Sequence, residues 1–425
     1  MSELAQVSLD SGEMIDFLQH IIDNNRHIQK NGKLPAAVEV IGESGLGKTS
    51  VVLQVAEKNN LNCVKLNLAQ IEELGDLVGF PVRQFELCKE GGKAGEKMVM
   101  KEVTLPNGLK VKKKVPVATE GTSECMWVDE AATEQYTKQG FEFTGNKRMT
   151  YCAPEWIADK KEGGILILDD WNRADIRFIQ AVMEIVDRQE YISWKLPKDW
   201  HILLTANPDN GEYLVNAIDN AQKTRFISVM MKWNEERWAE WAESQEIDDR
   251  CINFVLLQPE VIKGTVNPRS ITTFFNAISS FDNFDNHLGM IQMIGEGSVG
   301  LETATLFTSF INNRLDKLVT PKEMLHGKGD QSILDKLKEA INPNGDVRAD
   351  IASILATRLI NYTVIYSETN PITQEIVDRL KVLIKEESLF MNDIKFHLVK
   401  KLVNGNKTKF QKLLMDAEIQ NMVMQ

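Results

Sequence analysis

A glycine-rich loop between an apolar run and a helical segment constrains this chain more than any other feature. The loop spans Gly42–Ser50, "GESGLGKTS", and matches the pattern G-x-x-x-x-G-K-[ST]. It follows the apolar run "AAVEVIG" and opens a segment with helical spacing, which is the context that the pattern requires. Three glycines let the backbone curl so that consecutive N–H groups point at phosphate oxygens, namely Gly42, Gly45 and Gly47. The loop therefore predicts a nucleotide phosphate site at the end of a strand.

The polar residues of this loop have separate tasks in binding a nucleotide. The helix that begins near Lys48 offers its positive N-terminal end to the phosphates, and the Lys48 ammonium is expected to reach the β- and γ-phosphates. The Thr49 hydroxyl is expected to ligate Mg²⁺. No N-K-x-D guanine signature lies on a fitting loop, which favours ATP over GTP. The predicted nucleotide-binding residues are Gly42, Glu43, Ser44, Gly45, Leu46, Gly47, Lys48, Thr49 and Ser50.

Two adjacent carboxylates, Asp169 and Asp170, end the apolar run "GGILILDD". Like charges this close resist burial unless a cation or another partner is near. One interpretation is a solvated strand end, and the other is a metal and water site. Ligands of parallel α/β sheets bind outside the carboxyl ends of the strands. We therefore expect Asp169 to hold Mg²⁺ with Thr49, largely through water, and Asp170 to orient or deprotonate the water that attacks the γ-phosphate.

Short apolar strands alternate with helices in the first half of the 425-residue chain. Strands are expected at residues 36–42, 62–68, 163–170, 201–208 and 225–231. This alternation predicts an α/β fold with a parallel sheet that helices cover on both faces. After residue 231 the strand signals stop and the chain reads as helices. The sequence therefore predicts an α/β domain followed by one or two helical domains.

Residues 96–118 interrupt this alternation. The segment has two β-like arms around "PNG", a turn signal for a hairpin. Its second arm is rich in lysine, at Lys110, Lys112, Lys113 and Lys114. Such a run more commonly belongs to a solvent-exposed hairpin at a sheet edge, where lysines prevent pairing with another strand. The alternative is a loop that binds a polymeric or acidic partner.

Composition limits the partners and the compartment. The formal net charge of −12 disfavours nonspecific wrapping of nucleic acid, although a local basic track stays possible. The five cysteines have neither a C-x-x-C pair nor metal-ligand spacing, which favours packing thiols in a reducing compartment over a disulfide framework. The N-terminus does not read as a secretory signal, and no apolar stretch approaches a membrane span. We therefore expect a cytoplasmic protein without membrane contact.

Several motifs occur in the order typical of one family. The chain resembles the MoxR-like branch of AAA+ ATPases, close to the CbbQ/NorQ and dynein-related groups. "GESGLGKTS" looks like the Walker A loop, and "LILDDWNRAD" looks like the Walker B strand with the family's Asn-Arg-Ala. "AVMEIVDRQEYISWKLPKDWHILLTANP" is similar to the helix, pre-sensor hairpin and sensor-1 strand. "NAQKTRF" resembles the arginine-finger segment, and "TVNPRSITTFFNA" resembles the sensor-2 helix.

The resemblance implies roles for three further residues. Asn207 would be the sensor-1 residue that aligns the attacking water, and Arg225 would be the finger that reaches the ATP of a neighbouring subunit. The active unit would then be a ring, usually a hexamer. Arg269 would be the sensor-2 arginine that couples the nucleotide to lid movement. Independent support exists for a helix start there, because Asn267 is a good N-cap and Pro268 suits the first helical position.

The resemblance also implies a domain plan and a function. The AAA+ core would span residues 1–231 with the lysine-rich hairpin inserted, a helical lid 232–316, and a C-terminal helical region 317–425. Relatives are chaperone-like ring ATPases that remodel or assemble a protein partner, often beside a protein with a von Willebrand A domain. The family usually has Asp-Glu where this chain has Asp169-Asp170. Aspartate is one methylene shorter, and a small misplacement of a catalytic group can cost orders of magnitude in rate, so the alternatives are slow hydrolysis or compensation by the backbone.

Three functions therefore compete. The first is a magnesium-dependent ATPase ring that remodels a protein. The second is an ATP-gated scaffold with little hydrolysis, which the aspartate at position 170 favours. The third is a nucleic-acid motor or clamp-loader-like ATPase, which the lysine-rich hairpin favours and the net acidity opposes. The sequence has no signature of a dehydrogenase or of another small-molecule enzyme, since no G-x-G-x-x-G, H-E-x-x-H or G-x-S-x-G pattern fits.

Overall fold

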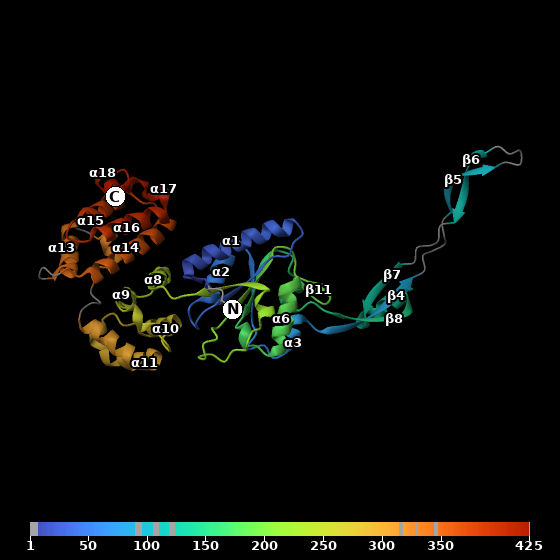
Figure 1. Ribbon diagram of the computed structural model, residues 1–425, viewed down its shortest axis with the longest axis horizontal. Helices are drawn as coiled ribbons and strands as arrows, with labels where there is room; N and C mark the ends of the chain where they lie inside the picture. The colour runs from blue at the N-terminus through green and yellow to red at the C-terminus, as the bar shows by residue number, and fades with distance from the viewer. Residues whose placement is uncertain are drawn as a thin grey trace. The chain divides into compact units, whose positions relative to one another are not determined.

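The computed structural model describes residues 7–89, 96–104, 110–118, 124–313, 318–327, 330–343 and 347–424. The chain divides into two compact units, each of several segments (Figure 1). Unit 1 comprises Met1–His20, Val40–Val55 and Ser228–Gln425, and unit 2 comprises Ile21–Glu39 and Ala56–Ile227. No helix of the described residues has the length and apolar character that crossing a membrane requires.

The α/β core contains a six-stranded sheet in the order β1-β13-β2-β12-β9-β3. The strands are β1 (Ser8–Leu9), β2 (Ala37–Ile41), β3 (Asn62–Asn67), β9 (Gly164–Asp169), β12 (Trp200–Ala206) and β13 (Phe226–Met231). The pairs β1–β13, β12–β9 and β3–β9 are parallel, which confirms the predicted α/β fold. The sheet has one strand more than the five expected, because β1 is only two residues long and gives no periodic signal.

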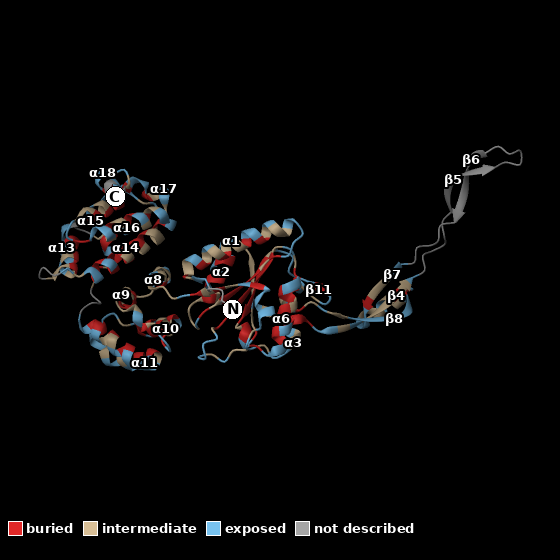
Figure 2. Ribbon diagram, in the orientation of Figure 1, coloured by how far each residue is buried: buried red, intermediate tan, exposed pale blue. Residues whose placement is uncertain are grey.

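Burial explains why the central strands could be predicted from the sequence. Every residue of β9 and β12 is buried. Figure 2 shows buried residues in red on strands beside α6. Strands covered on both faces need continuous apolar runs. The helices of this region are α1 (Ser11–Lys30), α2 (Lys48–Lys58), α3 (Leu74–Val78), α5 (Glu155–Ala158), α6 (Ile176–Arg188) and α7 (Asn220–Lys223). Helix α6 begins where the Asp175 side chain accepts from the Arg177 N–H, and it buries one apolar face.

The insertion between β3 and β9 is larger than the predicted hairpin. Strands β4 (Pro81–Lys89), β7 (Glu124–Asp129) and β8 (Glu142–Tyr151) form an antiparallel sheet in the order β7-β4-β8, and α4 (Thr133–Lys138) lies between β7 and β8 in the chain. The two predicted arms are confirmed as β5 (Glu96–Thr104) and β6 (Lys110–Ala118), which pair antiparallel. The "PNG" turn lies outside the described residues. Strand β8 is mostly exposed, so it lacks the apolar alternation that reveals a strand.

The cysteine prediction was wrong at one pair. Cys88 and Cys125 form a disulfide, although 37 positions separate them in the chain. They are direct partners in the β4–β7 register, with their Cα atoms 4.1 Å apart. Strand pairing brings them together, which the cysteine spacing alone does not reveal. The free cysteines of the described residues are Cys63, Cys152 and Cys251.

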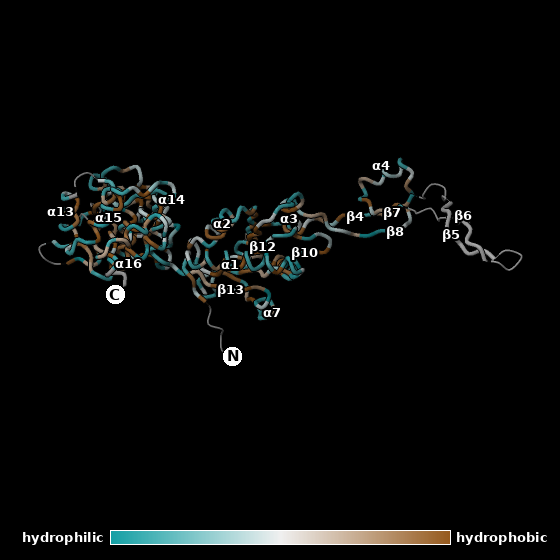
Figure 3. Tube along the Cα trace, turned by 90° about the horizontal axis from the view of Figure 1, so that it is seen from above, coloured by the Kyte–Doolittle hydropathy of each residue, from teal (hydrophilic) through white to brown (hydrophobic). Residues whose placement is uncertain are grey.

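Two hydrophobic cores follow β13 in unit 1. The first helical cluster contains α8 (Glu235–Ser244), α9 (Asp249–Leu257), α10 (Pro268–Ile278) and α11 (Leu288–Asn312), packed around phenylalanines such as Phe254 and Phe307. The C-terminal helical cluster contains α12 (Pro321–His326), α13 (Asp330–Ile341), α14 (Ala349–Thr369), α15 (Gln374–Lys385), α16 (Asn392–Gly405), α17 (Lys407–Phe410) and α18 (Ala417–Met424). Figure 3 shows apolar residues in brown among α14, α15 and α16.

A buried arginine ties the two helical clusters together. Arg358 of α14 is 1% exposed and donates to the Asn253 Oδ1 of α9 at 2.7 Å and to the Glu243 Oε1 of α8 at 3.2 Å. Arg358 also pairs with Asp249 of α9. The second carboxylate oxygen of Glu243 is buried, with no hydrogen-bond partner among the described residues. Burial raises the pKa of Glu243 from 4.5 to about 7, because desolvation outweighs the attraction of Arg358.

Replacing Glu243 with glutamine is expected to remove a pH dependence of stability. Between its ordinary pKa of 4.5 and about 7, Glu243 ionises in the unfolded chain but keeps its proton in the folded one. The wild-type free energy of unfolding should therefore fall with rising pH across this window, by on the order of 3 kcal/mol from this group. Glu243→Gln should gain stability relative to wild type from about pH 5 to about pH 8 in urea unfolding. The exposed Glu236→Gln on the same helix is the control, and equal pH profiles for the two variants would contradict the assignment.

Candidate nucleotide-binding site

The glycine-rich loop joins the end of β2 to the start of α2, as predicted. Gly45 and Gly47 have φ angles of 81° and 93°, a region that glycine adopts without strain. A Cβ on Gly45 would lie 2.5 Å from the Asn267 Oδ1, so the close approach of the segment before α10 also requires glycine. A Cβ on Gly47 would meet no described atom within 4 Å. The loop thus combines a tight backbone with open space on one side.

The charged ammonium of Lys48 lies inside this loop. The residue is 8% exposed, and its ammonium donates to the carbonyl oxygens of Gly42 at 2.6 Å and Glu43 at 3.0 Å. Because Lys48 is also the first residue of α2, its charge adds to the positive end of the helix. The structure therefore places a cation and a helix N-terminus at one loop, which is the arrangement that binds phosphate.

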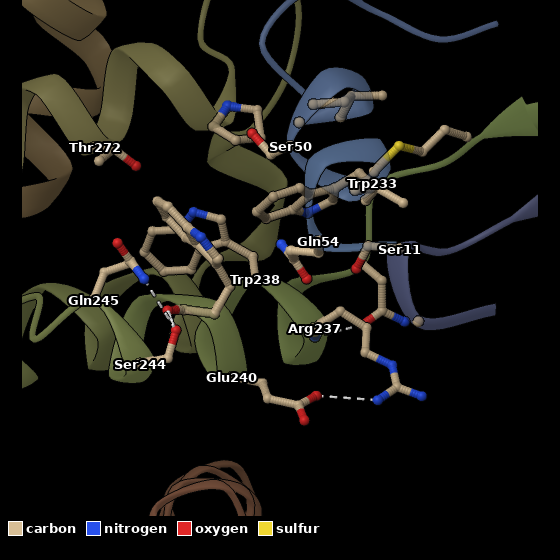
Figure 4. Close-up of a pocket in the computed structure, with 18 of the residues that line it drawn as sticks. Ser11, Ser50, Gln54, Trp233, Arg237, Trp238, Glu240, Ser244, Gln245 and Thr272 are labelled. Atoms are coloured by element: carbon tan, nitrogen blue, oxygen red, sulfur yellow. Dashed lines mark hydrogen bonds and ion pairs between the residues drawn. The ribbon is translucent and has the colours of Figure 1, made fainter. Parts of the chain in front are cut away.

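A cavity of about 700 Å³ borders the loop in unit 1. Its lining includes Gly45, Gly47 and Ser50 from the loop and α2, and Trp233, Trp238 and Trp241 from the segment after β13. Figure 4 shows Ser50, Gln54, Trp233 and Trp238 around this space. Ile365 and Glu368 of α14 also line the cavity, so the C-terminal helical cluster reaches it.

Three residues that line the cavity each carry a buried polar atom without a hydrogen-bond partner in the described part of the chain. The indole N–H groups of Trp233 and Trp238 and the Thr272 hydroxyl are buried without a hydrogen-bond partner among the described residues. Buried polar groups are usually paired, so three unpaired ones close together set this region apart. These residues were missed in the sequence, where the only available signal was the spacing W-x4-W-x2-W.

Arg269 lies beside the glycine-rich loop, and its sensor-2 role stays a prediction. The predicted helix start is confirmed: Asn267 caps α10, its Oδ1 accepts from the Ser270 N–H at 3.0 Å, and Pro268 is the first residue. Arg269 lines the cavity, and its Cβ would be 3.1 Å from a Cβ on Gly45. The capped helix therefore delivers Arg269 to the glycine-rich loop.

In unit 2 the two adjacent aspartates have separate partners. The Thr205 hydroxyl donates to the Asp169 Oδ1 at 2.6 Å, and the Lys65 ammonium lies 2.8 Å from the Asp169 Oδ2. The Asn207 amide donates to the Asp170 Oδ1 at 3.1 Å, and the Arg173 guanidinium lies 3.7 Å from the Asp170 Oδ2. Each carboxylate therefore has its own cation and its own hydrogen-bond donor. Sequence reasoning found Asn207 but missed Lys65 and Thr205, which reach Asp169 from neighbouring strands.

The backbone at Asp170 also separates the two carboxylates. Asp170 has φ 52° and ψ 35°, the left-handed conformation. Among non-glycine residues this region favours Asn and Asp, and it is a form of strain that clusters at functional sites. Strand β9 ends at Asp169, and Asp170 precedes the 3-10 turn Trp171–Arg173. The aspartate at this position is thus explained by backbone geometry, whereas the family pattern has glutamate.

Arg225 follows α7 at the start of β13. Its guanidinium donates to the Ala221 carbonyl at 2.8 Å and lies 3.5 Å from the Asp187 Oδ2 of α6. Its side chain is 34% exposed. The structure thus groups Asp169, Asp170 and Asn207 in unit 2, and the loop with Arg269 in unit 1. A shared ion between Thr49 and Asp169, and a role for Arg225 toward a second subunit, stay predictions.

Comparison with known proteins adds similarities of low degree. No protein-family model matches the sequence, and no curated protein matches it. A mutant of RuvB from Thermotoga maritima has 12% identity and a TM-score of 0.34, covering 77% of this chain and 84% of that chain. A candidate ATPase from Cytophaga hutchinsonii has 15% identity and a TM-score of 0.28, covering 88% of this chain and 90% of that chain. TM-scores of this size do not establish a shared fold, so these similarities assign the chain to no family.

Proposed function

We propose that this chain is an AAA+ ATPase that binds Mg-ATP at Gly42–Ser50 and hydrolyses it. One observation carries the proposal: a loop with two left-handed glycines joins a strand to a helix, encloses the buried Lys48, and borders a cavity rich in tryptophan. Loop N–H groups and Lys48 would bind the triphosphate, and the helix end would favour its negative charge. The motif order of the sequence supports the AAA+ assignment and its MoxR-like branch.

The tryptophan-lined cavity is proposed to take the base. Its size of about 700 Å³ suits a small organic ligand. The side-chain amide of Gln54, which lines this cavity, would donate to ring nitrogens, which are acceptors on a purine. An indole face also stacks on any base. The cavity thus supplies both a polar and an apolar contact beside the phosphate loop.

Replacing Trp233 with alanine is expected to weaken ATP binding about tenfold, because base–aromatic stacking contributes on the order of 1–3 kcal/mol. Isothermal titration with a slowly hydrolysed ATP analogue measures the change. Trp156→Ala is the matched control, since Trp156 packs against Trp194 in unit 2 and lies outside the cavity lining. Equal ATP affinities for wild type and Trp233→Ala would show that the base does not bind in this cavity.

The residues at Asp169 fit the ion that the triphosphate requires. Asp169 offers carboxylate oxygens, the donors that Mg²⁺ prefers, and Thr49 would supply a hydroxyl. The ion would neutralise charge that develops on the phosphates. Asp170 would accept a proton from the attacking water or orient it, and the Asn207 amide would hold Asp170 and that water in line. The Lys65 ammonium, 45% exposed, would turn from Asp169 when the ion binds.

We also propose that the chain acts as a ring in which Arg225 reaches the nucleotide of a neighbouring copy. Arg225→Ala is expected to leave ATP binding intact and to lower turnover about 10³-fold, the effect of a missing arginine finger. Phosphate release and nucleotide affinity are measured on particles of known mass. The exposed Arg188→Ala, at the end of α6, is the control. An Arg225→Ala ring that turns over at the wild-type rate would exclude the finger.

The finer function rests on the resemblance alone. A MoxR-like ring would remodel or assemble a protein partner, including one with a von Willebrand A domain. The scaffold that binds ATP with little turnover is the second candidate, and the short side chain of Asp170 favours it. Steady-state phosphate release by wild type separates the two, because a scaffold would bind ATP and assemble without it.

A further inference from the structure

We infer that Asn172 is a positioning residue for hydrolysis, which fixes Asn207 against Asp170. The inference rests on the proposed ATPase function and goes beyond it, since neither the motifs nor the roles above assign Asn172 a task. Asn172 lies in the short 3-10 turn Trp171–Arg173 that follows Asp170. It is 4% exposed, which is unusual for an asparagine in a turn.

Asn172 binds the main chain of Asn207 at two points. The Asn172 Nδ2 donates to the Asn207 carbonyl at 2.8 Å, and the Asn207 N–H donates to the Asn172 Oδ1 at 3.3 Å. A side-chain amide carries a donor and an acceptor side by side, so it can bind the N–H and the carbonyl of one residue. Asn207 follows the last residue of β12 and precedes Pro208, so no regular strand pairing fixes its backbone beyond this point.

These bonds close a ring of contacts around Asp170. The Asn207 side chain donates to the Asp170 Oδ1 at 3.1 Å, and Asp170 is joined to Asn172 through Trp171. Removing the Asn172 amide opens the ring, leaves two buried main-chain groups without their partner, and frees the Asn207 side chain to leave Asp170. Misplacing a catalytic group by about 1 Å can cost about 10²-fold in rate.

The main chain of Asn172 has a different task. Its carbonyl accepts from the Asn216 N–H at 2.8 Å, and the Asn216 Nδ2 donates to the Ala174 carbonyl at 2.7 Å. These bonds anchor the loop after β12, which includes the 93% exposed Leu214, to the same turn. Because they use the carbonyls of Asn172 and Ala174, a substitution of the Asn172 side chain leaves them in place. The two tasks are therefore separable by mutation.

Asn25 supplies a matched control. It is 1% exposed, and its side chain makes the same reciprocal pair of bonds with the main chain of Ala36, both at 2.9 Å. Asn25→Ala and Asn172→Ala therefore remove the same reciprocal pair of bonds from two buried places in unit 2, and Asn25→Ala also removes a contact of 3.4 Å between the Asn25 Nδ2 and the His201 Nδ1. A purely structural role predicts similar losses of melting temperature and no specific loss of turnover in either variant.

The test measures kcat, ATP affinity and melting temperature for full-length wild type, Asn172→Ala, Asn207→Ala, their double variant and Asn25→Ala. Asn172→Ala should lose about 10²-fold in kcat with the ATP dissociation constant changed by less than about threefold. The double variant should be no slower than Asn207→Ala, because both changes disable one unit. Asn172→Asp keeps the shape of the side chain but loses the Nδ2 donor, so its kcat should also fall. This second variant tests the inference if Asn172→Ala fails to fold.

Two results would overturn the inference alone. One is an Asn172→Ala or Asn172→Asp enzyme with a kcat loss no larger than that of Asn25→Ala. The other is a double variant whose losses multiply. A wild-type protein that binds no ATP, or binds it without hydrolysis in any assembly state, would overturn the proposed function and the inference together.

Discussion

Replacing Lys48 with alanine is expected to lower both ATP affinity and turnover, each by at least about 10²-fold. Lys48 is 8% exposed and donates to two carbonyl oxygens of its own loop, so its ammonium lies inside the loop that we propose binds the phosphates. Alanine removes the only charge that the loop motif directs at the β- and γ-phosphates. Titration calorimetry and phosphate release measure the two losses.

Lys58→Ala is the control for this change. Lys58 ends the same helix α2 and is exposed, so it shares the local structure without the contact to the loop. Thermal unfolding of both variants shows whether the loop variant still folds. Lys48→Ala binding ATP as tightly as Lys58→Ala would show that the nucleotide does not use this loop.

Replacing Asp170 with asparagine is expected to keep ATP binding and to lower turnover by about 10²–10⁴-fold, the range for loss of a general base. Asparagine is nearly isosteric, tolerates the left-handed backbone at φ 52°, and can still accept from the Asn207 amide. The change thus removes the negative charge while keeping the turn. Single-turnover hydrolysis separates chemistry from product release.

Asp175→Asn is matched to this variant. Asp175 caps α6, and asparagine caps a helix as well as aspartate does. Asp175→Asn therefore makes the same substitution near Asp170 and should leave turnover unchanged. Asp170→Glu should be slower than wild type as well, because glutamate fits the left-handed region poorly. Wild-type turnover in Asp170→Asn would exclude Asp170 as the water-activating residue.

The parts of the fold that the sequence predicted are those with local causes. The glycine-rich loop, the buried strands β9 and β12 and the capped start of α10 each follow from neighbouring residues. A covered strand needs a continuous apolar run, and Asn followed by Pro is a favourable start of a helix. Those signals are complete within about ten residues, so one sequence suffices to find them.

The missed parts depend on contacts between distant segments. Cys88 and Cys125 meet only because β4 pairs with β7. Lys65 reaches Asp169 because β3 and β9 are neighbours with Asn67 opposite Asp169. The cavity draws on the loop, the segment after β13 and α14 at once. Such contacts are set by sheet register and helix packing, which no single window of the sequence contains.

The measurement that tests the central claim most directly is steady-state phosphate release from ATP by the full chain, with and without Mg²⁺, beside Lys48→Ala. Particle mass is recorded with and without ATP in the same preparations. The account predicts Mg²⁺-dependent turnover by wild type that Lys48→Ala lacks, on particles of several subunits. Wild type that neither binds nor hydrolyses ATP, or turnover that Lys48→Ala retains in full, would contradict it.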